Sequence, residues 1–184
     1  MRMNGRLNGC ALRIFLAGSV LTGSTAILFA SLGVRINTTD SVPQGLYLVT
    51  KDGNAPLVEF CPQGIVSTLS IVRGYRPAGI CADGAAPLLK PVIAHSGDMV
   101  ALTIDGIRVN GMLLPNTAPQ PADGAGRTLA AWPSGQYTVA PQSIWVASNH
   151  PNSFDSRYFG PIPAALIRHR LKPLWVLGSR NIAP

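Results

Sequence analysis

The longest apolar stretch of the chain covers residues 14–34, and none of its 21 residues carries a charge. A helix of about 20 apolar residues is long enough to cross the hydrocarbon core of a bilayer. The stretch therefore predicts one N-terminal transmembrane helix over residues 14–34. The alternative is a cleaved secretory signal peptide, because a basic start, an apolar run and the small residues Ala30 and Ser31 also fit that pattern.

Basic residues on one side of this stretch indicate its orientation. Arg2, Arg6 and Arg13 all precede it, and positive charges favour the cytoplasmic side of a membrane. We expect residues 1–13 to form a cytoplasmic basic N-terminus. Residues 35–184 then form one domain in the periplasm of a bacterium, held at the inner (cytoplasmic) membrane by a single pass.

Beyond residue 34 the apolar positions fall into short runs, and glycine and proline, 19 and 16 in the whole chain, separate these runs. Short apolar runs between frequent turn residues are typical of a mainly β domain. A short helix is also expected where proline suits a first helical turn, over residues 163–167. The predicted strands cover residues 46–49, 57–60, 137–139, 144–147 and 174–177.

The clearest local prediction is a β-hairpin. Residues 99–104 and 107–109 are apolar runs on either side of Asp105-Gly106, a pair that supplies the positive φ angles of a tight type I′ turn. The next segment, residues 111–135, is rich in Pro, Ala and Gly and has little periodicity. We expect it to be a flap or surface excursion, held down by Trp132.

Composition supports a chain that lies partly in lipid. Hydrophobic residues make up 47% and charged residues only 12%, against about a quarter charged in soluble domains. Four of the 15 basic residues precede the first acidic residue, Asp40, so the net charge of +7 is partly a topology signal. The cluster Arg168-His169-Arg170 with Lys172 suits anionic lipid better than nucleic acid, and a nucleic-acid binder is disfavoured.

Cysteine usage agrees with export. Cys61 and Cys81 both fall in the predicted periplasmic part, where an oxidising environment permits a disulfide bond between them. The alternative is a pair of free, buried thiols, because one sequence does not show connectivity. The three histidines have no paired spacing and no Cys-x-x-Cys element occurs, so no metal site and no cofactor are predicted.

One serine and one lysine have the context that nucleophilic catalysis requires. A serine hydroxyl needs a base, and a lysine amine serves as that base only when its surroundings lower its pKa. Lys90 lies between apolar pairs, Leu88-Leu89 and Val92-Ile93, and burial disfavours its charged form. Ser41 lies on the turn before a predicted strand. The non-catalytic alternatives are that Ser41 is an ordinary turn serine and that Lys90 is a solvated surface lysine.

Four stretches, in this order after an apolar span, carry a resemblance to a known family. They are residues 41–47 (SVPQGLY), 73–81 (RGYRPAGIC), 87–98 (PLLKPVIAHSGD) and 153–161 (SFDSRYFGP). On these stretches the chain resembles the signal peptidase I superfamily and, within it, the TraF-type conjugative transfer signal peptidases. The resemblance spans nearly the whole chain and implies a signal-peptidase-like β domain that uses a Ser/Lys dyad.

The resemblance implies roles for individual residues. Ser41 corresponds to the nucleophile and Lys90 to its general base, and Ser153 corresponds to a residue that orients the lysine amine. The backbone N–H of Ser41 and the side chain of Thr39 correspond to the two donors that stabilise the developing oxyanion. The alternative for Thr39 is a residue that caps a turn.

Asp155 has two possible roles, which the sequence leaves open. It is either part of a structural pair with Arg157 or an acidic group that takes part in the reaction, as the resemblance to TraF-type members suggests. The chain also departs from the family pattern: Pro91 follows the lysine where a second basic residue is usual, and His95-Ser96 precedes Gly97-Asp98. These departures bear on substrate choice more than on chemistry.

The predicted function is therefore a membrane-anchored serine endopeptidase that processes exported precursors such as conjugative pilin, by cleavage or by cyclisation. Its predicted partners are a precursor peptide and the membrane, without nucleic acid. The alternative is a non-catalytic, membrane-tethered β module of a conjugation or secretion apparatus. An exported esterase is disfavoured because no Gly-x-Ser-x-Gly elbow occurs.

Overall fold

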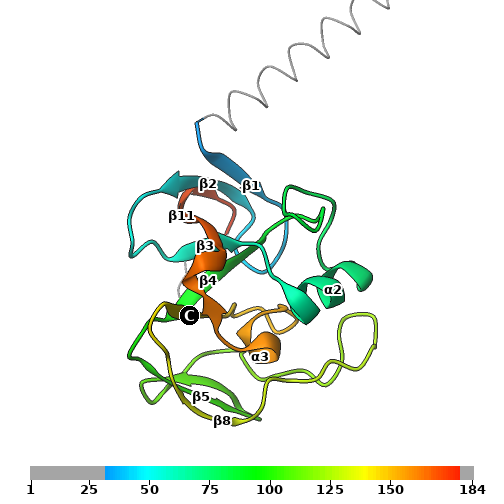
Figure 1. Cartoon of the computed structure of the whole chain (residues 1–184), viewed down its shortest axis with the longest axis vertical. Coiled ribbons are helices and arrows are strands. Elements are labelled where there is room, and N and C mark those ends of the chain that lie inside the picture. The colour runs from blue at the N-terminus through cyan, green and yellow to red at the C-terminus, as the bar shows by residue number, and fades with distance from the viewer. Residues whose placement is uncertain (1–31, 179–184) are drawn as a thin grey trace, which may run out of the picture. The chain divides into compact units, whose positions relative to one another are not determined.

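The computed structural model describes residues 32–178 (Figure 1), of which residues 36–178 belong to one compact unit. This part is mainly β, as the sequence predicts. Its strands are β1 (Val34–Asn37), β2 (Gly45–Thr50), β3 (Leu57–Phe60), β4 (Leu88–Ala94), β5 (Met99–Thr103), β6 (Gly106–Val109), β7 (Met112–Leu113), β8 (Gly135–Thr138), β9 (Ser143–Val146), β10 (Ile162–Pro163) and β11 (Ile167–Val176). Its helical elements are α2 (Gly64–Val72), α3 (Ser156–Phe159) and the short 3-10 helix η1 (Ala164–Leu166).

The strands form two sheets. The larger has seven strands in the order β1-β2-β11-β3-β4-β9-β10, and the smaller has four in the order β7-β6-β5-β8. The long strand β11 lies between β2 and β3 and pairs with both in antiparallel fashion. Strand β11 therefore joins β1 and β2 to the rest of the sheet.

Strand β4 lies inside the larger sheet, between β3 and β9. Lys90 is opposite Val58 of β3, and Val92 is opposite Val146 of β9. Side chains of a strand point to the two faces of the sheet, and the Lys90 side chain is buried on the face to which it points.

Strand β9 separates two hydrophobic cores because its side chains alternate between the faces of the sheet. Ile144 and Val146 pack into one core, and Trp145 packs into the other. The first core also contains Val58, Phe60, Leu88, Leu129, Phe154, Phe159 and Ile162. The second also contains Ala94, Val100, Leu102, Ile107, Leu114, Val139 and Ala147.

The predicted hairpin is confirmed, but its predicted turn is wrong by one residue. Thr103 pairs with Gly106, so the loop is Ile104-Asp105 and not Asp105-Gly106. Gly106 begins β6 with a φ of 132°, and a Cβ atom there would lie 2.7 Å from the Thr117 hydroxyl. The close approach of Thr117 therefore requires glycine at position 106 inside the strand. Ile104, the first residue of the two-residue loop, is 86% exposed.

Other predicted elements differ in extent. The strand predicted over residues 174–177 is the end of β11, which begins at Ile167. The helix predicted over residues 163–167 is observed only as the three-residue 3-10 helix η1.

Helix α2 was not predicted, because its buried positions are Ser67 and Ser70 while Ile65 is 78% exposed. Its apolar residues Val66 and Leu69 pack only partly buried against the first core, so the sequence lacks the clear apolar stripe of an ordinary amphipathic helix.

The predicted membrane span, residues 14–34, lies outside the described residues except for its last three positions, and Val34 is the first residue of β1. Within residues 32–178, no helix has the length and apolar character needed to cross a membrane.

The segment 111–135 contains β7 and an isolated bridge between Ala122 and Thr128 but otherwise little regular structure. It is nevertheless held against the domain. Leu129 packs into the first core, and the backbone N–H of Trp132 donates to the Arg157 carbonyl at 2.8 Å.

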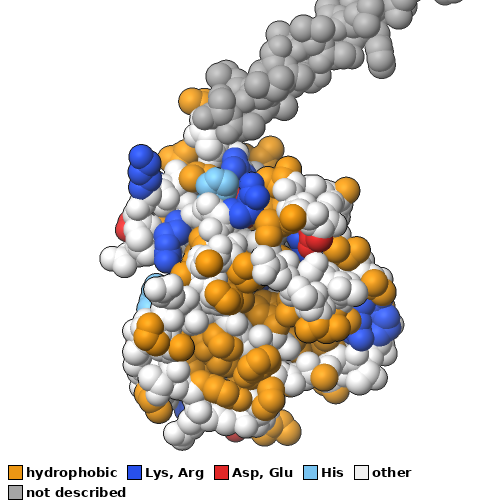
Figure 2. Space-filling model, in the orientation of Figure 1, with side chains coloured by type: hydrophobic (Ala, Val, Ile, Leu, Met, Phe, Trp, Pro, Cys, Tyr) orange, Lys and Arg blue, Asp and Glu red, His pale blue; other side chains and the backbone are white. Residues whose placement is uncertain are grey.

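Hydrophobic side chains gather over β5 and β8 on the face that Figure 2 shows, whereas basic side chains gather near β2 and β11. The basic cluster predicted from the sequence lies on β11. Two of its members approach the buried Glu59 carboxylate, His169 at 3.4 Å and Arg168 at 3.8 Å. Part of the cluster's charge is therefore balanced within the protein.

Candidate active site

Three side chains that are far apart in the sequence meet around one amine. The Lys90 Nζ atom lies 2.7 Å from the Ser41 Oγ atom and 2.8 Å from the Ser153 Oγ atom. Lys90 is only 3% exposed and Ser153 only 2%, whereas Ser41 is half-buried. The partly exposed Ser41 hydroxyl therefore lies next to the buried Lys90 amine.

Each member of this group comes from a different element. Lys90 is on β4, in the middle of the larger sheet. Ser41 lies on the turn between β1 and β2, and Ser153 lies shortly before α3. The side chains meet because β4 is a central strand while the two serines are on loops that lead into its neighbourhood.

Burial lowers the pKa of the Lys90 amine to about 8, because desolvation disfavours the ammonium form. The Asp155 carboxylate opposes this shift and the Arg157 guanidinium adds to it. A substantial fraction of the amine is therefore neutral near pH 8, and a neutral amine has a lone pair that accepts a proton from a hydroxyl group.

Asp155 and Arg157 form a fully buried ion pair, with 2.7 Å between Arg157 Nη2 and Asp155 Oδ2. The second carboxylate oxygen of Asp155 accepts from the Nε and backbone N–H groups of Arg157, and the Oδ2 atom also accepts from the Ser148 N–H. Asp155 makes no hydrogen bond to Lys90 among the described residues. These contacts favour the structural role for Asp155 over a direct role in the reaction.

Arg157 in turn holds the loop that carries Ser153. Its guanidinium group donates to the carbonyl oxygens of His150 at 2.9 Å, Pro151 at 3.0 Å and Ser153 at 3.1 Å. The predicted supporting residue Arg157 thus acts on the candidate site through the backbone of the loop that positions Ser153.

Thr39 lies in the same turn as Ser41 and is exposed. Its hydroxyl donates to the Asn37 Oδ1 atom at 2.8 Å. Among residues 32–178, no oxygen accepts a hydrogen bond from the backbone N–H of Ser41. This N–H is therefore available as a donor, whereas the Thr39 hydroxyl has to rotate to serve as a second one.

Asn37 is a buried polar residue of this site that was not predicted. Its side chain contacts the backbone on both sides of Ser41. The only sequence signal for it is its place four residues before the serine, which is too weak to single it out.

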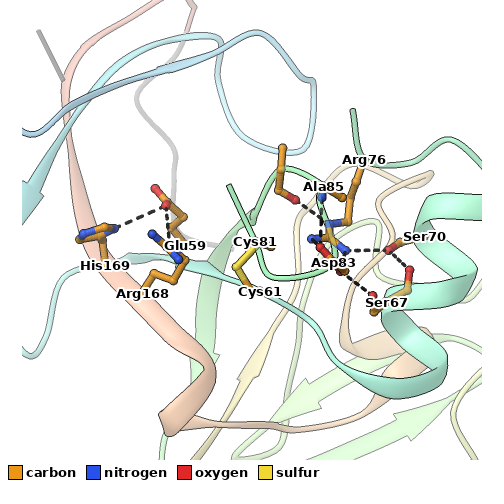
Figure 3. The surroundings of a disulfide bond; sticks show 11 residues. Glu59, Cys61, Ser67, Ser70, Arg76, Cys81, Asp83, Ala85, Arg168 and His169 are labelled. Carbon is orange, nitrogen blue, oxygen red and sulfur yellow. Dashed lines mark hydrogen bonds and ion pairs between the residues drawn. A yellow bond between two sulfur atoms is a disulfide. The ribbon is translucent and has the colours of Figure 1, made fainter. Parts of the chain in front are cut away.

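The disulfide between Cys61 and Cys81 is present, with a Cα–Cα distance of 5.7 Å (Figure 3). It joins the end of β3 to the loop after α2, and so closes the segment that contains the helix. The same segment is tied together by Arg76, whose guanidinium pairs with Asp83 at 2.7 Å and donates to Ser70 (Figure 3). The prediction of a disulfide is confirmed.

Replacing both cysteines with serine is expected to lower the free energy of unfolding by about 3 kcal/mol, because the bond closes a 20-residue separation in the unfolded chain. Urea denaturation of the wild type and the double variant measures this difference. A reductant should destabilise only the wild type. Equal unfolding midpoints of the two proteins without reductant would contradict the expectation.

No cluster of three or more His, Cys, Asp or Glu side chains able to hold a metal ion occurs within residues 32–178. The chemical groups that the site brings together are an alcohol and an amine whose positive charge is disfavoured by burial.

Comparisons with known proteins found a family model, relatives and a solved structure that are similar to this chain. The model of the family described as signal peptidase, peptidase S26, matches residues 7–175. A plasmid transfer protein TraF of Escherichia coli is 41% identical over 169 residues, which cover 86% of this chain and 93% of the relative. A conjugal transfer protein TraF of Agrobacterium tumefaciens (strain 15955) is 34% identical, over 88% of this chain and 94% of the relative. Among solved structures, a signal peptidase I from Enterococcus faecalis V583 aligns with 67% of this chain and 99% of its own, with 20% identity and a TM-score of 0.36.

Proposed function

The chain belongs to the signal peptidase family, peptidase S26, and we propose that it is a serine endopeptidase in which Ser41 is the nucleophile and Lys90 the general base. The observation that carries this proposal is the 2.7 Å separation of Lys90 Nζ and Ser41 Oγ. The lowered pKa of Lys90 supports it, because only the neutral amine accepts the serine proton.

In the proposed reaction the Ser41 hydroxyl transfers its proton to the neutral Lys90 amine while its oxygen attacks the carbonyl carbon of the scissile peptide bond. The resulting ammonium then protonates the leaving amine, the C–N bond breaks, and an ester with Ser41 remains. Ser153 supports this sequence because its hydroxyl, 2.8 Å from Nζ, fixes the direction of the amine. A second nucleophile then releases the acyl group from Ser41.

The tetrahedral intermediate of this reaction carries a negative oxygen, which needs hydrogen-bond donors. We assign the backbone N–H of Ser41 as the first donor because no described oxygen accepts from it. Thr39 is the second, after rotation of its hydroxyl away from Asn37. Removing one such donor typically costs about 10²-fold in kcat.

The proposed substrate is an exported precursor protein of a conjugation apparatus, such as a pilin. The relatives that cover most of this chain are named plasmid transfer and conjugal transfer proteins, and signal peptidases act on precursors with an apolar segment. The proposed anchor over residues 14–34 would hold the enzyme beside such a segment at the inner membrane, with the catalytic domain in the periplasm.

The identity of the second nucleophile decides the product. Water gives a cleaved peptide, whereas the N-terminal amine of the same substrate gives a circular one. Mass spectrometry of a co-expressed pilin-like precursor tests both the activity and the product: ring closure expels water and lowers the mass by about 18 Da relative to simple trimming. An unprocessed precursor would contradict the proposed function.

The pH dependence of kcat/KM provides an independent expectation. Since the pKa of Lys90 is lowered to about 8, kcat/KM should rise about tenfold per pH unit below that value and level off above it. The measurement is a series of initial rates with a fluorogenic precursor peptide in buffers of constant ionic strength. A flat profile between about pH 6 and pH 9 would exclude a base with this pKa.

A further inference from the structure

Asn37, the last residue of β1, places a buried amide beneath the turn that carries Ser41. Its side chain is 7% exposed. Its Nδ2 atom lies 2.8 Å from the Thr39 carbonyl oxygen, 3.0 Å from that of Val42 and 3.2 Å from that of Pro43. Two N–H bonds are thus shared among three carbonyl groups, which come from both sides of Ser41.

The other end of the amide is also occupied. The Asn37 Oδ1 atom accepts from the Thr39 backbone N–H at 3.2 Å and from its hydroxyl at 2.8 Å. The neighbours fix the orientation of the amide, because the three carbonyl groups only accept and the backbone N–H only donates. Asn37 therefore contacts the turn through all of its polar atoms.

A second group holds the far end of this turn. The Tyr47 hydroxyl donates to the Pro43 carbonyl oxygen, and the Tyr47 ring is fully buried in a core cluster with Val42. Burial raises the pKa of Tyr47 to about 12, so the hydroxyl remains protonated and able to donate at the pH where Lys90 is neutral.

The Ser41 backbone N–H donates to no described oxygen, so this N–H does not fix the residue's position. The contacts of residues 39, 42 and 43 fix it instead, and most of them go to Asn37. Attack on a carbonyl group is sensitive to the placement of the nucleophile, and an error of about 1 Å can cost about 10²-fold in rate.

We propose that Asn37 is a positioning residue, which sets the attack geometry of Ser41 by holding the carbonyl groups of Thr39, Val42 and Pro43. The proposal rests on the proposed function, because it concerns the same nucleophile. Asn37 touches neither Lys90 nor the reacting atoms, so its removal should change the rate of the chemical step and not the proton affinity of the base.

The test uses two variants that lack the Asn37 amide donor. One replaces the NH2 group with an accepting oxygen, and the other has a side chain too short to reach the carbonyl groups. Asn37→Asp keeps the shape but places oxygen opposite the three carbonyl groups, and Asn37→Ser is neutral but does not reach them. In each folded variant we expect kcat to fall about 10²-fold and KM to stay within about threefold. In Asn37→Ser, which adds no charge, the rise of kcat/KM should also remain centred near pH 8. Thermal unfolding of each purified protein shows whether it is folded at the assay temperature.

The matched control is Gln44→Ala. Gln44 is also an amide in this turn, but its side chain is exposed, and among the described residues it donates only to the Asp40 carboxylate. Its replacement should leave kcat within about twofold of wild type. Asn37 variants that are folded and also keep kcat within twofold would overturn the proposal, as would a loss confined to KM. The proposed function fails separately, if Ser41→Ala retains activity.

Discussion

Replacing Ser41 with alanine, or Lys90 with methionine, is expected to lower kcat on a precursor peptide by about 10⁴-fold or more. Ser41→Ala removes the atom that forms the acyl bond, and Lys90→Met removes the amine 2.7 Å from it. Because the two groups act as a unit, the double variant should be no slower than either single variant. Initial rates with the purified full-length protein measure all three.

Two exposed residues provide matched controls for these variants. Ser134→Ala and Lys51→Met remove the same chemical groups at exposed positions, and both should leave kcat within about twofold of wild type. Unchanged processing by both Ser41→Ala and Lys90→Met would favour the alternative of a non-catalytic β module. A loss in Ser41→Ala alone would point to a different base.

The Lys90→Met variant also has a predicted effect on stability. The folded-state pKa of about 8 lies below the ordinary value of 10.5, so the unfolded chain binds the proton more tightly between these values. The free energy of unfolding of the wild type should therefore rise as the pH increases from about 8 to 10.5. Lys90→Met lacks this group, and its stability should not show that rise.

Replacing Arg157 with leucine is expected to lower the free energy of unfolding by about 3–5 kcal/mol. The substitution leaves the fully buried Asp155 carboxylate without its cation. It also removes the donors to the carbonyl groups of His150, Pro151 and Ser153. Urea denaturation followed by tryptophan fluorescence measures the loss.

The ion pair between Arg127 and Asp123 provides the comparison, because Arg127 is 43% exposed. Arg127→Leu should cost about 1 kcal/mol or less, since solvent screens the exposed guanidinium and the buried Asp123 carboxylate keeps its contacts with Tyr75 and Arg73. If Arg157→Leu were no more destabilising than Arg127→Leu, the buried pair would not have the structural role described here. A large loss of activity in a fully stable Arg157 variant would instead reopen a catalytic role for the pair.

The sequence singled out the three residues that the structure brings together around the Lys90 amine. Lys90 stands out because apolar residues surround it on both sides, and that pattern persists in the fold as a central strand. Ser41 and Ser153 came from the family resemblance, which the match to the peptidase S26 family confirms at the level of the family. The structure adds the distances that bring the three together.

What the sequence did not predict depends on long-range contacts. The hairpin turn is displaced because Thr117, more than ten residues away, approaches Gly106. Helix α2 has buried serines because Ser67 and Ser70 bond to the Asp83 and Arg76 network near the disulfide. Asn37 is different, because its partners lie only two to six residues away, but the residue types alone do not show that the turn brings their carbonyl groups to the amide.

The most direct test of the central claim is an NMR titration of the Lys90 side chain, followed through the 13C resonance of its Cε atom in protein labelled at lysine. The account predicts a midpoint near pH 8, where burial places the pKa, and the same midpoint for the rise of kcat/KM. A midpoint near 10.4, the value of a solvated lysine amine, would contradict the claim that Lys90 is a neutral base for Ser41.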